Sequence, residues 1–235
     1  IAALVQVEML EAGYAAVAEF HYLHNAPNGA PYADPAEMSA RIVTAAADTG
    51  IGLTLLPVFY QYGGCDRRPL GPGQMRFFNT PDSFSVLHAA AARAVATLPG
   101  DARIGIAPHS LRAVDPEGLA AVLPLVPDGP VHIHVAEQVA EVEEVLAHRG
   151  ARPVRWLLDN AAVDERWCLI HATQMEPTET EAMARSGAVA GLCPITESNL
   201  GDGIFDGRRF LEAGGAFGVG ADSNVRIALA EELRT

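Results

Sequence analysis

Ionisable side chains follow three short apolar segments in the second half of the chain, each of which predicts a buried strand. His134 and Glu137 come after 131–133, His171 after 167–170, and Asp222 after 216–219. The carboxyl ends of parallel strands lie at one rim of a sheet or barrel. We therefore expect these side chains to share a polar site. Neutral imidazole and carboxylate are ligands that a zinc-type ion prefers, and the same groups can activate water. The pattern predicts a metal-dependent hydrolytic site.

Each of these residues also has an ordinary structural interpretation. His132 and His134 alternate on one strand and point to the same face, where His134 could be a satisfied core histidine. Glu137 could simply occupy the first turn of a helix, where negative charge is favoured. His171 could be buried and bonded to backbone, and Asp222 could be a helix cap. Their joint position at strand ends favours the functional interpretation.

The elements that must position these residues alternate regularly along the chain. Apolar segments predict seven strands, at 15–20, 52–59, 103–107, 131–135, 167–170, 189–192 and 216–219. Helical periodicity and cap signals predict helices between and beside them, at 1–12, 35–47, 81–97, 137–149, 177–186 and 225–235. Such alternation is typical of a parallel sheet covered by helices.

Both an open doubly wound sheet and a closed barrel fit this alternation. No Gly-x-Gly-x-x-Gly follows the first strand, and ionisable residues end many different strands, which in a barrel face one mouth. We therefore expect an α/β fold of the (β/α)8 TIM-type barrel kind. The chain opens in a helix-like segment with no strand before it. We expect a single, incomplete barrel domain over 1–235 that lacks strand 1 and part of its last helix.

The amino-acid composition argues against some classes of binding partner. The net charge is −13 and no basic run occurs, which argues against nucleic acid and anionic membranes. Hydrophobic residues make up 49% of the chain, so a large core is expected, and neither a membrane span nor a signal peptide is visible. The three cysteines show no paired metal spacing and predict reduced thiols in a cytoplasmic protein.

The chain resembles the amidohydrolase superfamily of metal-dependent barrel hydrolases and deaminases. His134-x-x-Glu137, His171 and Asp222 match its mononuclear deaminase pattern. Within the superfamily the chain is most similar to the formimidoylglutamate deiminases of histidine degradation. Five stretches carry that resemblance: EFHYLH at 19–24, APHSLR at 107–112, VHIHVAEQ at 131–138, CPITESNLGDGIF at 193–205 and GADSNVR at 220–226. The last two are specific to this branch.

The resemblance implies a role for each residue. His134 and Asp222 would ligate one Zn²⁺, with iron as the other candidate metal, and Asp222 would also accept a proton from the attacking water. His171 would orient the nucleophile and stabilise the tetrahedral intermediate. Glu137 would carry protons to the departing nitrogen. The reaction would convert N-formimidoyl-L-glutamate to N-formyl-L-glutamate and ammonia, in a protein that is expected to be a homodimer.

Three residues are candidates for substrate binding. Arginine binds carboxylates bidentately and glutamate carries two of them, so Arg112 is expected to contact this small-molecule substrate. By resemblance His109 and Tyr22 contact it as well. Their structural alternatives are a surface ion-pair residue for Arg112, a backbone anchor for His109 and a packed loop aromatic for Tyr22. The irregular stretch 63–80 is a candidate lid or substrate loop.

The sequence departs from the family pattern at its beginning. The His-x-His pair that the family carries on strand 1 and the small flanking β-sandwich have no counterpart here, so His134 and Asp222 are two of four expected metal ligands. His132-Ile133-His134 has the same spelling but lies on strand 5. We expect the 235-residue chain by itself to bind zinc weakly and to be poorly active.

Three other functions are compatible with the sequence. A related deaminase or chlorohydrolase would act on a purine or triazine, against which Arg112 speaks. A catalytically inactive barrel would serve as a scaffold, which would not need Glu137, His171 and Asp222 together. An open α/β binding domain would hold the ionisable strand ends too far apart to share a metal.

Overall fold

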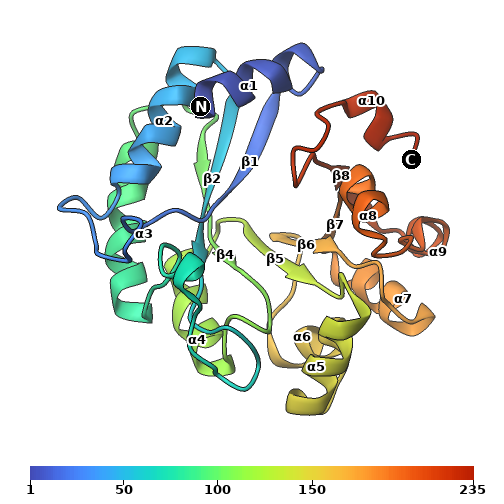
Figure 1. Cartoon of the computed structure of the whole chain (residues 1–235). Helices are drawn as coiled ribbons and strands as arrows, with labels where there is room; N and C mark the ends of the chain where they lie inside the picture. The colour runs from blue at the N-terminus through green and yellow to red at the C-terminus, as the bar shows by residue number, and fades with distance from the viewer. The chain divides into compact units, whose positions relative to one another are not determined.

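The computed structural model describes all 235 residues, which form two compact units. The first unit comprises Ile1–His109 with Ala113–Val131, and the second comprises Ser110–Arg112 with His132–Thr235. Both are built from parallel strands and helices, so the predicted α/β class is confirmed (Figure 1). The single incomplete barrel domain stays a prediction.

The first unit is built around a parallel sheet in which β2 is central. Its elements are α1 (Ala2–Glu11), β1 (Ala16–His21), α2 (Glu37–Thr49), β2 (Gly52–Phe59), α3 (Pro81–Val95), β3 (Arg103–Ile104), β4 (Ala107–Pro108) and α4 (Pro116–Val122), with 3-10 turns at Pro72–Gln74 and Leu123–Leu125. Strand β2 pairs with β1, β3 and β4, always in parallel. Helices α2 and α3 pack on β2, where Leu53 and Leu55 join Val43 and Ala91 in the core (Figure 1).

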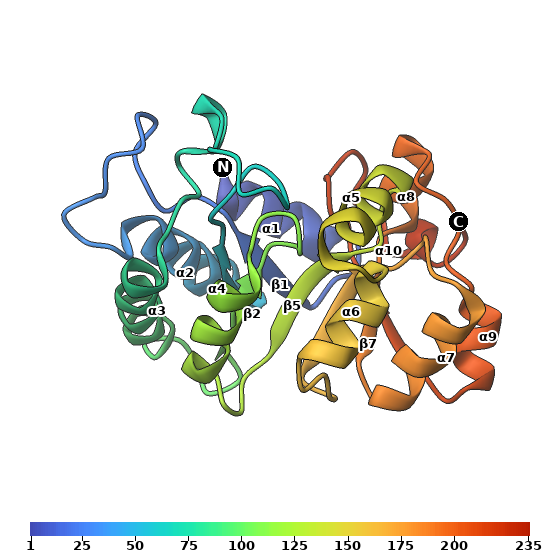
Figure 2. The ribbon, with the colours of Figure 1, turned by 90° about the horizontal axis from the view of Figure 1, so that it is seen from below.

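The second unit carries a parallel sheet in the order β5-β6-β7-β8. Its elements are β5 (Val131–Val135, whose first residue belongs to the first unit), α5 (Val139–Arg149), α6 (Pro153–Asn160), β6 (Trp167–His171), α7 (Pro177–Ser186), β7 (Val189–Leu192), α8 (Pro194–Leu200), α9 (Gly207–Glu212), β8 (Ala216–Val219) and α10 (Leu229–Glu232). Ile133, Leu169 and Ala190, on three neighbouring strands, are completely buried. Helices α5 and α6 lie side by side (Figure 2).

The predicted strands are confirmed, with one subdivision. Segment 103–107 forms two short strands, β3 and β4, because the backbone of Ile106 turns to form a bridge with Val131. Gly105 permits this close approach, since a Cβ at that position would lie 2.2 Å from the carbonyl oxygen of Pro130.

Three structural predictions were wrong in part. The C-terminal helix 225–235 is reduced to α10, because Asn224 takes a left-handed φ of 52° and Ala228 is extended. Helix α5 begins at Val139, after Glu137 rather than at it. Strand β8 is largely exposed rather than buried, because it is an edge strand of its sheet.

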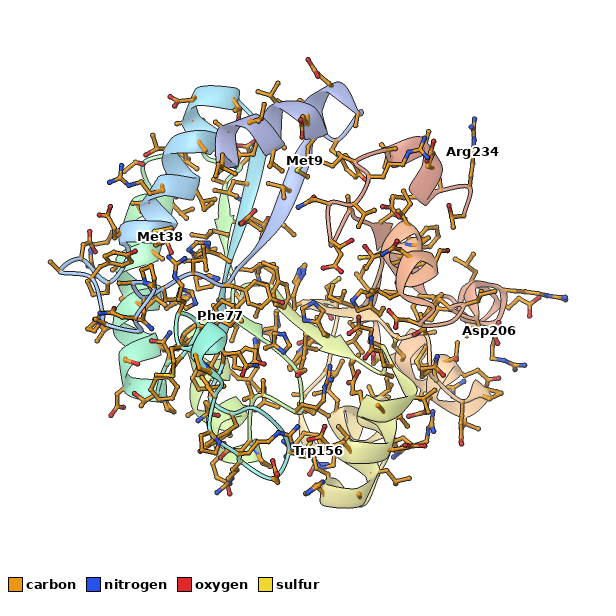
Figure 3. The ribbon with its side chains drawn as sticks, viewed as in Figure 1. Met9, Met38, Phe77, Trp156, Asp206 and Arg234 are labelled. Atoms are coloured by element: carbon orange, nitrogen blue, oxygen red, sulfur yellow. The ribbon has the colours of Figure 1, made fainter.

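Both tryptophans are buried and the three cysteines are unpaired. Trp156 on α6, labelled in Figure 3, and Trp167 on β6 are buried. Cys65, Cys168 and Cys193 form no disulfide. None of the helices combines the length and the apolar character that a bilayer crossing demands.

Candidate active site

The exit of β5 is held by a buried carboxylate. His134 is the penultimate residue of β5, and the chain turns at Ala136, whose φ of 50° lies in the left-handed region. Glu141, which is completely buried in the first turn of α5, accepts both backbone N–H groups of this turn, from Ala136 at 3.0 Å and from Glu137 at 2.9 Å. Glu141 therefore fixes the turn that presents Glu137.

The exit of β6 shows a second strained turn. His171, the last residue of β6, has φ 68°, and Ala172 follows with φ 51°. A left-handed non-glycine residue costs on the order of 1–3 kcal/mol and persists where surrounding contacts impose it. Here Ala172 donates to the carbonyl of Val135 at 3.1 Å and Gln174 donates to that of Ala136 at 2.8 Å. These two hydrogen bonds thus link the strained turn after β6 to the strained turn after β5.

The imidazole of His171 lies at the centre of the candidate site. Its ring stacks on that of His134, with centroids 5.5 Å apart and planes at 20°. On one side its Nε2 lies 3.8 Å from Oε1 of Glu137, and on the other its Nδ1 lies 3.1 Å from Oε1 of Glu197. Both ring nitrogens therefore face carboxylates.

Asp222 completes a group of possible metal ligands. One ligand atom from each of His134, His171 and Asp222 lies within 4.8 Å of the others. The two histidines are buried, whereas Asp222, three residues beyond the edge strand β8, is the exposed member. The sequence-based expectation that these strand ends lie close together is confirmed; their roles stay predictions.

The electrostatics of this group favour a bound cation. Burial raises the pKa of Glu137, opposed by His171 and reinforced by Asp202. Partial desolvation likewise raises the pKa of Asp222, opposed by His171 and reinforced by Glu197. Burial acts to lower the pKa of His171, but the hydrogen bond to Glu197 and the charge of Glu137 outweigh it and raise that pKa. A divalent cation among these carboxylates would offset their mutual repulsion.

The hydrogen bonds of Glu141 lead to a stability prediction. Replacing Glu141 with alanine is expected to lower the free energy of unfolding by about 2–6 kcal/mol, because two backbone donors lose their acceptor at about 1–3 kcal/mol each. Denaturant unfolding of the full-length protein measures the effect. Glu143→Ala, at an exposed position of the same helix, is the control. Equal unfolding midpoints for the two variants would contradict the role of Glu141.

Two of the predicted substrate residues belong to the first unit and lie close together there. Tyr22, just after β1, and His109, just after β4, have ring centroids 5.6 Å apart and meet edge to face. Phe77, labelled in Figure 3, packs edge-on against Tyr22 at 5.3 Å. Tyr60 lies 4.6 Å from the His109 ring. The rings of Tyr22 and His109 are therefore held by aromatic neighbours.

The third predicted substrate residue, Arg112, belongs to the second unit. It follows Ser110, which bridges in parallel to His134. Its positive charge acts on both Glu141 and Glu137, in the direction that lowers their pKa values. Its Nε is buried and makes no hydrogen bond within the chain. Arg112 is thus a half-buried cation whose Nε–H is available to donate a hydrogen bond.

The sequence interpretation missed the residues that hold this site together. Thr196, Glu197 and Asp202 are all buried, and Glu141 is too. Thr196, Glu197 and Asp202 lie within the branch-specific stretch 193–205, and this stretch is the one sequence signal that points to them. A polar residue that is buried only through tertiary contact has no local pattern of its own.

Comparisons with known proteins show what the chain is similar to. The model of the amidohydrolase family matches residues 1–235. The chain is 53% identical over its whole length to the formimidoylglutamate deiminase of Pseudomonas aeruginosa, and covers 51% of that protein. It is 32% identical over 140 residues, 57% of this chain and 32% of the other, to a 5-methylthioadenosine/S-adenosylhomocysteine deaminase of Natronomonas pharaonis.

Solved structures show the same fold. An amidohydrolase from Brucella melitensis superposes with a TM-score of 0.97 at 54% identity, over 99% of this chain and 52% of that one. A zinc-complexed atrazine chlorohydrolase from Arthrobacter aurescens superposes with a TM-score of 0.82 at 22% identity, over 99% of this chain and 51% of that one. The chain thus spans about half the length of the relatives it matches over its whole extent.

Proposed function

This chain belongs to the amidohydrolase family, and from that premise we propose that the protein is a zinc-dependent deiminase that hydrolyses N-formimidoyl-L-glutamate to N-formyl-L-glutamate and ammonia. The 53% identity to the Pseudomonas aeruginosa formimidoylglutamate deiminase supports this substrate. The observation that carries the proposal is the approach of His134, His171 and Asp222 to within 4.8 Å, with Glu137 beside them. The three free cysteines agree with a cytoplasmic location.

The donor group fits a zinc ion. Imidazole nitrogen and carboxylate oxygen are ordinary zinc ligands, and His134 and Asp222 would hold the ion from two strand ends. Zinc, when bound, supplies a nucleophile at neutral pH by lowering the pKa of water to about 7. The zinc-complexed chlorohydrolase of the same fold is consistent with this choice of metal.

The surrounding residues move and hold protons. Glu197 accepts a hydrogen bond from Nδ1 of His171. The Nε2 of His171 would therefore contact the nucleophile and the oxygen of the tetrahedral intermediate. Glu137, whose pKa is raised by burial, is suited to pick up a proton and deliver it to the leaving nitrogen. Asp222 would accept the proton that the attacking water gives up.

The carboxylates of the substrate require positive charge and hydrogen-bond donors. We assign Arg112 to one carboxylate, because its buried Nε has no partner within the chain. His109 and Tyr22 are assigned to the substrate as well, since their rings are held against each other by Phe77 and Tyr60.

A purine-nucleoside deaminase is the second candidate. Its support is the 32% identity to the Natronomonas pharaonis deaminase, which extends over 57% of the chain only. The same proton-handling residues would serve there; of the two substrates in that relative's name, 5′-methylthioadenosine offers no carboxylate to Arg112, whereas S-adenosylhomocysteine carries one. The higher identity over the whole chain favours the formimidoyl substrate.

The test is ammonia release by the zinc-loaded, full-length protein. N-formimidoyl-L-glutamate is compared with guanine and 5′-methylthioadenosine under the same conditions. Turnover of the formimidoyl compound alone supports the proposal, and turnover of a purine alone would replace it with the second candidate.

Arg112→Met should raise KM for N-formimidoyl-L-glutamate more than it lowers kcat, because a binding contact is lost.

A further inference from the structure

The first turn of α8 contacts both sides of the candidate site. Helix α8 follows β7 directly and opens the stretch 193–205, of which the proposed chemistry uses only Glu197, as the acceptor for Nδ1 of His171. Two adjacent residues of this turn, Thr196 and Glu197, are buried polar side chains. One reaches the end of β6 and the other the loop after β8.

Glu197 fixes the ring of His171 through a single oxygen atom. Its Oε1 accepts from Nδ1 of His171 at 3.1 Å and from the backbone N–H of Cys193 at 2.9 Å. The backbone donor holds the carboxylate in one rotation, and a carboxylate in that position only accepts. The proton of the neutral imidazole is therefore kept on Nδ1, and Nε2, which faces Glu137, keeps its lone pair.

Thr196 fastens the segment that carries Asp222. Its hydroxyl pairs with the hydroxyl of Ser223 at 2.9 Å, and the backbone N–H of Ser223 donates to Oγ1 of Thr196 at 3.2 Å. Ser223 adjoins Asp222 in sequence, so two hydrogen bonds restrain the exposed loop in which this carboxylate lies. Strand β8 ends before this loop, at Val219.

The turn itself is anchored from a third direction. The backbone N–H of Ile195 donates to Oε2 of Glu232 on α10 at 3.0 Å, and Glu232 is buried. The start of α8 is thus tied to the C-terminal helix while its side chains hold His171 and the Asp222 loop.

We propose that Thr196 and Glu197 are positioning residues, which set the orientation and tautomer of His171 and the placement of Asp222 from one helical turn. The inference rests on the proposed function for its catalytic meaning. It gives the branch-specific stretch 193–205 a physical role: a fixed spacing between a proton-handling imidazole and a metal-binding carboxylate. Partners of this kind typically change activity or metal affinity by about 10–100-fold when they are removed.

The Glu197 contact is tested by a pair of variants in the full-length, zinc-loaded protein. Glu197→Gln keeps an amide oxygen for both donors, because the reversed amide would set an N–H against that of Cys193. Glu197→Ala removes the acceptor altogether. We expect Glu197→Ala to lower kcat for N-formimidoyl-L-glutamate about 10–100-fold with little change in KM, and Glu197→Gln to retain most of it. Ser198→Ala, exposed on the same helix, is the matched control.

A direct readout separates positioning from general loss of structure. In protein labelled with ¹⁵N-histidine, His171 should be in the Nδ1–H form in wild type and in Glu197→Gln, and should shift toward the Nε2–H form in Glu197→Ala. An unchanged tautomer in Glu197→Ala, or equal losses of kcat in both variants, would overturn the role of Glu197. Because this spectrum needs no substrate, it remains decisive if the proposed substrate proves wrong.

The Thr196 contact is tested by zinc affinity, measured by competition with a chelator. Thr196→Val has the same shape without the hydroxyl, and Thr196→Ser restores the hydroxyl. We expect Thr196→Val to raise the zinc Kd about 10–100-fold and Thr196→Ser to keep it near wild type. Equal Kd values for the three proteins would overturn the role of Thr196.

Discussion

Replacing Glu137 with glutamine is expected to lower kcat for N-formimidoyl-L-glutamate by about 10²–10⁴-fold, the range of a general acid–base group. Glutamine preserves the shape of the side chain and the backbone hydrogen bond from residue 137 to Glu141, so the turn after β5 stays in place. What it removes is a carboxyl whose pKa is raised by burial and which lies 3.8 Å from Nε2 of His171. Steady-state kinetics of the full-length protein measure the loss.

The loss should be confined to catalysis. Because Glu137 is not among the grouped ligand atoms of His134, His171 and Asp222, zinc content should stay near that of wild type. Glu143→Gln makes the same chemical change at an exposed position of α5 and should leave kcat unaltered. If Glu137→Gln retained more than about a tenth of the wild-type kcat, the proton would have to reach the leaving nitrogen by another group.

The sheet strands were the most predictable part of the fold. Strands β2, β5, β7 and β8 begin and end where the apolar, β-rich segments do, and β6 extends one residue further to include His171. Burial was less predictable than position, since β8 has the apolar composition of a core strand but lies at a sheet edge. Whether an apolar strand has neighbours on both sides depends on tertiary structure alone.

Short helices explain most of what was missed. Helices α4, α6 and α8 have 7, 8 and 7 residues, and each begins with proline, which in the sequence resembles a loop signal as much as a helix start. Two turns are too few for a clear apolar period. Without a predicted α8, the sequence does not place Thr196 and Glu197 at the site, although both lie within the branch-specific stretch 193–205.

The sequence predicts the residues whose type is required by the proposed chemistry. It does not predict the residues that are needed only to hold the backbone of the site in place. His134, Glu137, His171 and Asp222 stand out because few structural reasons place such groups together at strand ends. Glu141 does not stand out, because a glutamate in the first turn of a helix is ordinary. Only the structure shows that both its oxygens accept backbone N–H groups of the turn at Ala136.

Replacing Asp222 with asparagine is expected to reduce kcat/KM by about 10³-fold and to lower the zinc bound per chain, because one side chain is assigned two tasks. As a metal ligand it supplies the carboxylate of the group formed with His134 and His171. As a base it accepts the proton of the attacking water. Asparagine is neutral, so it is a weaker ligand and no base. Metal analysis after dialysis and steady-state kinetics measure the two effects, with exposed Asp128→Asn as the control.

Excess zinc separates the two tasks of Asp222. If the carboxylate served only to hold the ion, saturating zinc would restore the activity of Asp222→Asn, since binding lost through affinity is recovered by mass action. Because the amide cannot take up a proton, we expect the activity to stay low even when zinc content returns to the wild-type level. Full recovery at saturating zinc would contradict the proton-accepting role of Asp222 and would assign that step to another group of the site.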